Sequence, residues 1–587
     1  MVLTLLAAVP TILLAQTAKA LYCAENTTLY FVYDNVTYTA GSSYTPDGET
    51  DARTVTAVYT GFLNGRGLDN LWYEKRNEMT TADFQSSFAA CRPTSTAYWF
   101  STNTGTTALT TINHIENLNT SNVTNMESMF TSCQRLTSLD VTHFDTSNVT
   151  NMHNMFRFCS GLTELNVSSF DTSNVKIMYN MFGFCSGLTS LDLTNFKTSN
   201  VTAMQYMFNN CSGLTSLNVS SFNTGKVRNM NAMFQGCNGL KSLTFGENFA
   251  TKSLLGSSTY YALNMFVGMN ARFIDFSNST YTNNVITEVN RSSGMFRNVP
   301  NTAVIYLPKD TPAPTSGDTQ NVVYTKDGEL VCEDYYSEDK VDIELPHDFK
   351  TKKAQYSRTM SRKYGTVILP YDFTSNDDIQ CYTMTQEHTK TMYFVPTQTV
   401  PAHTPFLFEK KSSGDKASFI MEDANYGITV KATKDTETDG PYEVTYENIK
   451  AQEKVGSADG QTMTWKTRGY YVNQTVADYS NTYYIASDKF YLADGELTLY
   501  PHRATFVGSW NYELSGDDAD APFLNVGIIG ADGEEQELTA IESAELFNTV
   551  NGISAIFDAQ GRRLQQLQPG LNIVHMEDGT VRKVMGK

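Results

Sequence analysis

The chain has 587 residues, of which 41% are hydrophobic and 12% aromatic, so it can form several packed domains. Its formal net charge of −19 excludes two classes of partner. Nucleic acids and anionic lipid surfaces both attract clustered Lys and Arg side chains, and a strongly acidic chain does not supply them.

The N-terminus carries an export signal pattern. Residues 2–15 are largely apolar, and Ala18 and Ala20 form an A-x-A-like cleavage site. The apolar stretch is shorter than the roughly 20 residues that a membrane-spanning helix needs. The sequence therefore predicts a secretory signal peptide over residues 1–20, and no later segment is apolar enough to cross a membrane. Lipidation of Cys23 is the weaker alternative, because the residue before it is not small.

Residues 21–80 follow this signal and contain stretches of strand-forming residues. The segments 28–33 and 54–59 are rich in Tyr, Val and Thr. Such segments favour β-strands. We expect a small N-terminal β cap here.

A 26-residue repeat then runs from Asn119 to Phe249. A Met-Phe pair recurs at 129/130, 155/156, 181/182, 207/208 and 233/234. Three residues after each Phe stands a cysteine: Cys133, Cys159, Cys185, Cys211 and Cys237. Degenerate copies on both sides extend the predicted array to residues 81–308. A fixed period of this length is typical of a solenoid, in which each copy completes the core of the next.

Each copy contains two apolar patterns. The first has i, i+3, i+7 and i+10 spacing, which predicts a short helix; in one copy it comprises Val149, Met152, Phe156 and Cys159. The second has the spacing L-x-x-L-x-L-x-x-aromatic, which predicts a short strand; there it comprises Leu162, Leu165, Val167 and Phe170. The sequence therefore predicts an α/β leucine-rich-repeat solenoid with a parallel sheet.

The region after the repeats changes character three times. Residues 309–350 mix Pro, Gly, Asp and Lys without periodicity, and we expect a linker. Short aromatic strands separated by turn residues predict an all-β, sandwich-like domain over 351–514. An acidic linker over 515–535 and a small β tail over 536–587 complete the predicted organisation.

No catalytic or metal-binding motif is present. The sequence lacks G-x-S-x-G, H-E-x-x-H and phosphate-loop patterns, and no cysteines form a C-x₂-C pair. Because the five repeated cysteines share a face with Met and Phe, packing in the core is favoured over disulfides between copies, and metal binding is the weakest alternative. We therefore expect neither an enzyme nor a cofactor.

The remaining candidate site is the outward face of the predicted sheet, whose side chains are small, polar and mildly acidic. It comprises Ser138, Asp140, Thr142, Glu164, Asn166, Ser168, Ser190, Asp192, Thr194, Ser216, Asn218 and Ser220. This face suits docking of an extended protein or a glycan. An ordinary solvated sheet face explains the same residues equally well.

The repeat N-T-S-N-V-T-N-M-x-x-M-F-x-x-C-x-x-L-T-S-L-D-V resembles that of the BspA-like leucine-rich-repeat surface proteins of Gram-negative anaerobes, and the lead-in 88–100 resembles their N-terminal cap. The ending 578–587 resembles the C-terminal sorting domain of type IX secretion cargo. The resemblance implies a non-catalytic adhesin, secreted or displayed on the outer membrane, that binds host matrix or other bacterial surface proteins. The alternative is carbohydrate binding by the aromatic-rich domain over 351–514.

Overall fold

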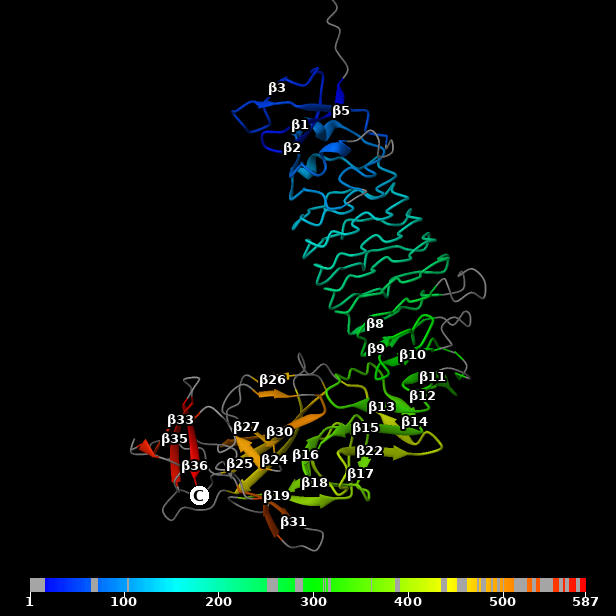
Figure 1. Cartoon of the computed structure of the whole chain (residues 1–587). Coiled ribbons are helices and arrows are strands. Elements are labelled where there is room, and N and C mark those ends of the chain that lie inside the picture. The colour runs from blue at the N-terminus through cyan, green and yellow to red at the C-terminus, as the bar shows by residue number, and fades with distance from the viewer. Residues whose placement is uncertain are drawn as a thin grey trace, which may run out of the picture. The chain divides into compact units, whose positions relative to one another are not determined.

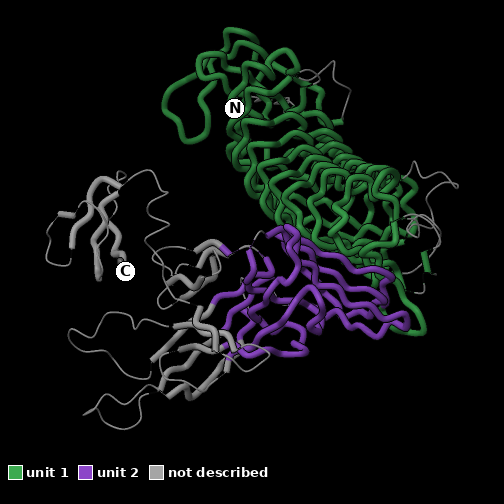
Figure 2. The backbone as a smooth tube through the Cα atoms, turned by 60° about the horizontal axis from the view of Figure 1, so that its bottom comes forward, with its two compact units in different colours: residues 1–330 green, residues 331–587 purple. Residues whose placement is uncertain are grey.

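A computed structural model describes residues 16–64, 72–250 except 103–104, 262–279 and most of 289–450, where the gaps are 310, 312, 315–317, 361, 386–390 and 434–440. From 462 onward it describes strands and the short segments beside them. The chain divides into two compact units, Met1–Leu330 and Val331–Lys587 (Figure 2).

The described residues are nearly all β, which corrects the expected α/β class. Their only helical elements are short 3₁₀ turns: η2 (Tyr73–Lys75), η3 (Ser86–Ala90) and η4 (Ile115–Asn117). None of them lies in the regular repeats.

Unit 1 begins with a five-stranded sheet in the order β5-β1-β2-β6-β7. Its strands are β1 (Thr17–Cys23), β2 (Thr28–Asp34), β5 (Ala57–Thr60), β6 (Thr81–Phe84) and β7 (Thr111–Asn113), with a separate hairpin of β3 (Ser43–Tyr44) and β4 (Arg53–Thr54). Strand β1 is buried from its second residue onward. Lys19 lies inside it, with Nζ 2.6 Å from Asp34 Oδ1. Cleavage after Ala20, as expected from the sequence, would therefore divide a strand of this sheet.

The 26-residue copies form stacked coils (Figure 1). Backbone amides in the Met-Phe segment donate to carbonyls one coil further on, as from Phe130 to Met155 at 2.9 Å. The same bond recurs from Phe156 to Met181 at 2.9 Å. Parallel bridges join the coils at equivalent positions: Asn125, Asn151, Ile177, Ala203 and Asn229. Each coil thus satisfies its backbone through its neighbours.

The predicted short helix in each copy is wrong. Asn154 and Phe158 have φ angles of 55° and 61°, in the left-handed region that interrupts a right-handed helix. Their counterparts share this conformation: Ser128, Asn180, Tyr206 and Ala232 at the first position, and Ser132, Phe184, Asn210 and Gly236 at the second. The apolar side chains still point inward, because turns between left-handed residues also place every third or fourth residue on one side.

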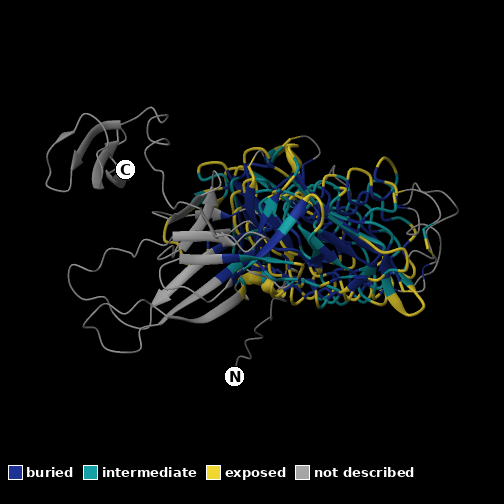
Figure 3. Ribbon diagram, turned by 90° about the horizontal axis from the view of Figure 1, so that it is seen from below, coloured by how far each residue is buried: buried dark blue, intermediate teal, exposed yellow. Residues whose placement is uncertain are grey.

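The interior of the coils is an aromatic column. Phe130, Phe156, Phe182 and Phe208 stack ring on ring at 5.7, 5.7 and 5.8 Å between centroids. All four side chains are fully buried. Buried residues fill the inside of the coils, and exposed residues lie on their outer turns (Figure 3).

The predicted strand forms only toward the end of the stack. Unit 1 has a parallel ladder here of β8 (Ser242–Thr244), β9 (Phe273–Asp275), β10 (Val304–Tyr306) and β11 (Val322–Lys326). Leu243 of β8 occupies the central leucine position of the pattern. In the coils before it the same segments are extended without a regular ladder, as residues 189–193 show.

The linker expected over 309–350 is instead built of strands. It contains β11, β12 (Glu329–Cys332) and β13 (Tyr335–Glu338), and reaches β14 (Phe349–Thr351). These strands are short, and β13 and β14 pair with strands further along the chain. Local periodicity does not reveal β13 and β14 for that reason, whereas Asp327 and Gly328, both with positive φ, mark a turn between β11 and β12 in the sequence.

Unit 2 is all β in its described part. Its sheets contain β15 (Lys353–Thr359), β16 (Tyr364–Val367), β17 (Phe373–Thr374), β18 (Ile379–Thr385), β19 (Thr391–Thr397), β20 (Thr399–Val400), β21 (Phe406–Lys410), β22 (Lys416–Glu422), β23 (Ile428–Val430), β24 (Tyr442–Lys450), β25 (Thr462–Tyr470), β26 (Gln474–Val476), β27 (Thr482–Ala486), β28 (Lys489–Leu492), β29 (Leu497–Leu499) and β30 (Arg503–Trp510). The central pairings are antiparallel, as between β15 and β22.

Six strands follow β30 in the described part of the chain. Strands β31 (Asn525–Ile529) and β32 (Glu535–Leu538) pair with each other, and β31 also pairs with β19, so residues 525–529 are not the expected linker. The acidic residues 517–520 lie outside the described part. A final antiparallel sheet in the order β34-β33-β35-β36 is formed by β33 (Ile553–Asp558), β34 (Arg563–Leu564), β35 (Gly570–Met576) and β36 (Val581–Gly586).

Candidate functional site

The twelve residues predicted to form a binding face are all exposed. Their apolar neighbours point the other way: Leu165, Val167, Leu191 and Leu193 are buried. The alternation arises because successive side chains of an extended segment lie on opposite sides. The structure therefore brings these residues together as parallel rows on one side of the stack, which we name the polar face.

A third of the polar face has a structural task. Asp140 Oδ1 accepts hydrogen bonds from the Thr142 N–H at 2.9 Å and the Thr142 hydroxyl at 2.6 Å. The same turn recurs at Asn166, Asp192 and Asn218. Asp and Asn favour such turns because their short side chains reach the backbone two residues on. This row of Asp and Asn side chains therefore stabilises the turn of each coil.

These turns also decide the chemistry of the face. The Thr194 backbone N–H and hydroxyl hold the pKa of the Asp192 carboxyl below its usual value. Thr142 lowers the pKa of Asp140 in the same way. Carboxyls that stay ionised accept hydrogen bonds and do not act as general acids at neutral pH. At neutral pH these two carboxylates are therefore hydrogen-bond acceptors.

An open groove of about 520 Å³ runs over the polar face. Five of the predicted residues line it: Ser190, Asp192, Thr194, Ser216 and Asn218. Ser242 and Thr244 of β8 continue the lining. Hydroxyls, one amide and one carboxylate are thus presented side by side across neighbouring coils.

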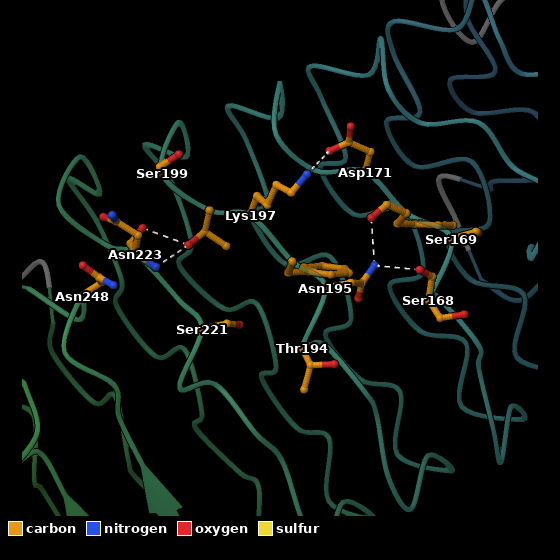
Figure 4. Close-up of a pocket in the computed structure, with 13 residues that line it drawn as sticks. Ser168, Ser169, Asp171, Thr194, Asn195, Lys197, Ser199, Ser221, Asn223 and Asn248 are labelled. Atoms are coloured by element: carbon orange, nitrogen blue, oxygen red, sulfur yellow. Dashed lines mark hydrogen bonds and ion pairs between the residues drawn. The ribbon is translucent and has the colours of Figure 1, made fainter.

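A second open groove, of about 640 Å³, lies where the coils turn away from the polar face (Figure 4). Asn195 spans two coils there, since its Nδ2 donates to the carbonyls of Ser168 and Phe170 at 3.1 and 2.9 Å. Lys197 Nζ lies 3.7 Å from Asp171 Oδ1 on the preceding coil. Ser168 and Thr194 also line this groove, so the two grooves share residues with the predicted face.

The five repeated cysteines lie deep inside the stack with free thiols. The Sγ of Cys185 donates to the Phe156 carbonyl at 3.0 Å, and Cys211 makes the same bond to Phe182 at 3.0 Å. Burial raises the pKa of Cys185 to about 12. Among the described residues, no group of three His, Cys, Asp or Glu side chains could hold a metal ion.

The aromatic side chains on which the carbohydrate alternative depends are mostly interior. Tyr364, Tyr371, Phe406 and Phe408 of unit 2 are all buried. The side chains of 483–485 lie outside the described residues. Sugar stacking needs an exposed ring face, so these four residues do not supply it.

Sequence reasoning missed a second set of rows, on the Met-Phe side of the coils. We name as the outer rows the residue after each central Met and the residue five further on: Glu127, His153, Tyr179, Gln205 and Asn231, with Ser132, Phe158, Phe184, Asn210 and Gly236. The sequence predicted a helix for these residues and placed the candidate site on the strand instead. The available signal was their variation from copy to copy, at positions where the neighbouring Met and Phe do not change.

Comparisons with known proteins centre on the coils. A family model described as a Mycoplasma protein of unknown function, DUF285, matches residues 94–190, 163–265 and 185–303. The matched region is the coil stack. A solved leucine-rich repeat protein from Bacteroides ovatus is similar at 14% sequence identity and a TM-score of 0.24, covering 55% of this chain and 83% of that chain. No curated protein matches the chain.

Within the described residues, no helix is long and apolar enough to span a bilayer.

Proposed function

We propose that this chain is a BspA-like leucine-rich-repeat protein, secreted or displayed on the surface of a Gram-negative bacterium. Its role is adhesion through non-catalytic binding of a protein ligand, such as host matrix or another cell's surface protein. The apolar segment before β1 supports export, and the final β sheet supports a sorting domain of the type IX kind. The family match over the coils and their resemblance to BspA-like repeats support the assignment.

The polar face is the single observation that carries the binding role. It repeats hydroxyl, amide and carboxylate groups at coil spacing along an open groove, while its carboxylates stay ionised. A partner that is extended along the stack meets the same groups at each coil. The same chemistry offers no nucleophile paired with a base, which supports a binding protein rather than an enzyme.

The test is retention of purified extracellular-matrix proteins and mucins on the immobilised full chain. We expect binding at micromolar concentration that falls at least tenfold in the double variant Ser190→Lys, Ser216→Lys, because two long cationic side chains would fill the groove. The matched control is Ser186→Lys, Ser212→Lys, which places the same charges on exposed positions of the same coils outside the groove lining.

Retention of neither class of ligand by the unmodified chain would contradict the binding function. Retention that is equal in the groove variant and the control would place binding on another surface.

A further inference from the structure

The outer rows differ from the polar face in how much they vary. On the polar face two rows alternate only between closely related residues, Asp or Asn and Thr or Ser, and the remaining row has Ser in three copies and Glu in one. The first outer row instead runs Glu127, His153, Tyr179, Gln205, Asn231. Repeats within one chain need the same core residues, because each copy packs in the same way. Surface positions at which the copies differ chemically can therefore give the surface specificity for one partner over another.

The outer rows also collect side chains typical of protein interfaces. His153, Phe158, Tyr179 and Phe184 are half-buried, and so is Tyr206, which follows the outer-row residue Gln205. Beside them stands Ile177, which is 37% exposed and one of only three large hydrophobic side chains classed as exposed among the described residues. Aromatic residues and Arg are enriched at interface centres, whereas Lys, Glu and Asp are depleted there.

The rings of this cluster contact one another and Arg157. Phe158 and Phe184 lie 4.3 Å apart between centroids, and the Arg157 guanidinium lies 4.4 Å from the Phe158 centroid. The His153 ring lies 4.6 Å from that of Tyr179. The exposed parts of these half-buried rings can pack against apolar side chains of another protein.

Charge separates the two sides of the stack. Residues 119–249 contain seven acidic and seven basic residues, so the repeats are neutral in a chain of net charge −19. The polar face carries Asp140, Glu164 and Asp192 and no basic residue.

Three of the seven basic residues of the repeats lie on the Met-Phe segments. Lys176 and Arg228 are exposed there, close in sequence to the outer rows, and Arg157 lies within the cluster. Its carboxylate, Glu127, is held by hydrogen bonds from Tyr98 and Asn151 and lies 3.4 Å from His153 Nδ1. The net positive charge of this side is therefore not offset by a free carboxylate of the outer rows.

We propose that the outer rows form a second recognition surface, centred on Tyr179 and Phe184, for a protein segment that presents carboxylates beside apolar side chains. The inference rests on the proposed binding function and assigns it a surface and a partner chemistry. Apolar side chains of the partner pack on the ring edges, and its carboxylates meet Arg157 and Lys176.

The experiment selects random-sequence peptides displayed on phage against the full chain, then measures the dissociation constant of the enriched peptides. We expect acidic sequences with aromatic or aliphatic residues. Tyr179→Ala should weaken their binding at least tenfold, and Lys176→Glu several-fold, with the latter effect shrinking at high salt. Lys197→Glu is the matched control, because Lys197 is exposed on the same coil but lies in the groove of Figure 4.

Each other outcome is decisive. Equal binding by Tyr179→Ala, Lys176→Glu and the unmodified chain overturns the surface, while the binding function stands. Loss of peptide binding in Ser190→Lys, Ser216→Lys alone moves recognition to the polar face. Enrichment of no peptide, or displacement by neutral glycans in an array, overturns the partner chemistry. Thermal unfolding of every variant checks that the coils remain folded.

Discussion

The coil stack and the core of unit 2 bury polar groups in different ways. In the stack, Thr172 is fully buried and its hydroxyl donates to the Lys197 carbonyl at 3.2 Å, one coil further on. Thr146 and Thr198 repeat this bond at 3.0 and 2.9 Å. In unit 2, buried His502 has its Nδ1 2.7 Å from the Ile368 carbonyl, and its Nε2 has no hydrogen-bond partner among the described residues.

The difference shows what repetition does for stability. Each coil forms its hydrogen bonds with a neighbouring coil of similar sequence. The same bond therefore recurs in every copy and joins only adjacent coils. The polar groups of unit 2 meet once, through residues far apart in the sequence, such as Arg503 and Asp339 at 2.6 Å. Loss of a contact should therefore act regionally in the stack and throughout the unit in unit 2.

The largest expected effect is Phe182→Ala. Phe182 is fully buried between Phe156 and Phe208, so truncation leaves a cavity and costs about 3–5 kcal/mol. Hydrogen exchange should then accelerate in the coils next to residue 182 and much less in the N-terminal sheet. The comparison variant is Phe419→Ala, which removes a buried ring of unit 2 and should accelerate exchange across the described strands of that unit. Uniform acceleration throughout unit 1 by Phe182→Ala would contradict a regional response.

Acid should weaken unit 2 more than the stack. Burial lowers the pKa of His502 to about 4, whereas the pKa of an unfolded histidine is about 6.5. As pH falls from 6.5 to 4, the unfolded chain binds a proton that the folded unit excludes, so stability present above pH 6.5 is lost in this window. The loss approaches about 3 kcal/mol.

The measurement is denaturant unfolding of the full chain at several pH values, compared with His502→Asn, whose amide can still donate to Ile368. The variant should lose this part of the pH dependence. In unit 1 the hydrogen bond to Asp83 raises the pKa of His114. Protonation of His114 therefore favours the folded state, and acid does not destabilise unit 1 through this histidine. A pH response of unit 2 that is unchanged in His502→Asn would show that other groups cause it.

Glycine substitutions sharpen the same comparison at smaller cost. A Cβ on Gly187 would lie 2.5 Å from the Ser160 carbonyl oxygen and 2.6 Å from that of Leu162, both backbone atoms of the preceding coil. Gly187→Ala should therefore cost about 1–3 kcal/mol, because the coils must separate. Gly414→Ala is the control, since nothing lies within 4 Å of its Cβ position, and should leave the unfolding midpoint almost unchanged. Similar costs for the two variants would contradict the tight coil contact.

The period and the inward residues of the stack could be predicted from sequence because every copy restates them. Phe156 and Cys159 lie inside, where the pattern placed them. The helix could not be distinguished from the real turns, since the left-handed residues Asn154 and Phe158 carry no residue type that demands this conformation. Asn favours the left-handed region, but Phe adopts it here only because the neighbouring coil accepts its backbone bonds.

Unit 2 and the candidate surfaces show the limits of local pattern. Strands β13 and β14 pair with β15 and β23, which lie further along the chain, so the sequence around each strand does not show its partner. Exposure of Ser190 and Asp192 followed from strand alternation alone. The cluster of Arg157, Phe158 and Phe184 is built across two coils, so its members become neighbours only when the 26-residue spacing is combined with the stacked geometry.

The smallest effect expected is that of Cys185→Ala. The thiol donates one neutral hydrogen bond to the Phe156 carbonyl, and its loss should cost about 1 kcal/mol of stability.

Burial raises the pKa of Cys185 to about 12 and that of Cys381 to about 11. Both native thiols should therefore resist alkylation at pH 8. During denaturant titration, the repeated cysteines should become reactive together with the coils, and Cys381 with unit 2. Mass spectrometry of the labelled peptides separates the two sets. Labelling of Cys185 in the folded chain would contradict the protection of its thiol. Simultaneous exposure of both sets at every denaturant concentration would show that the two units do not open separately.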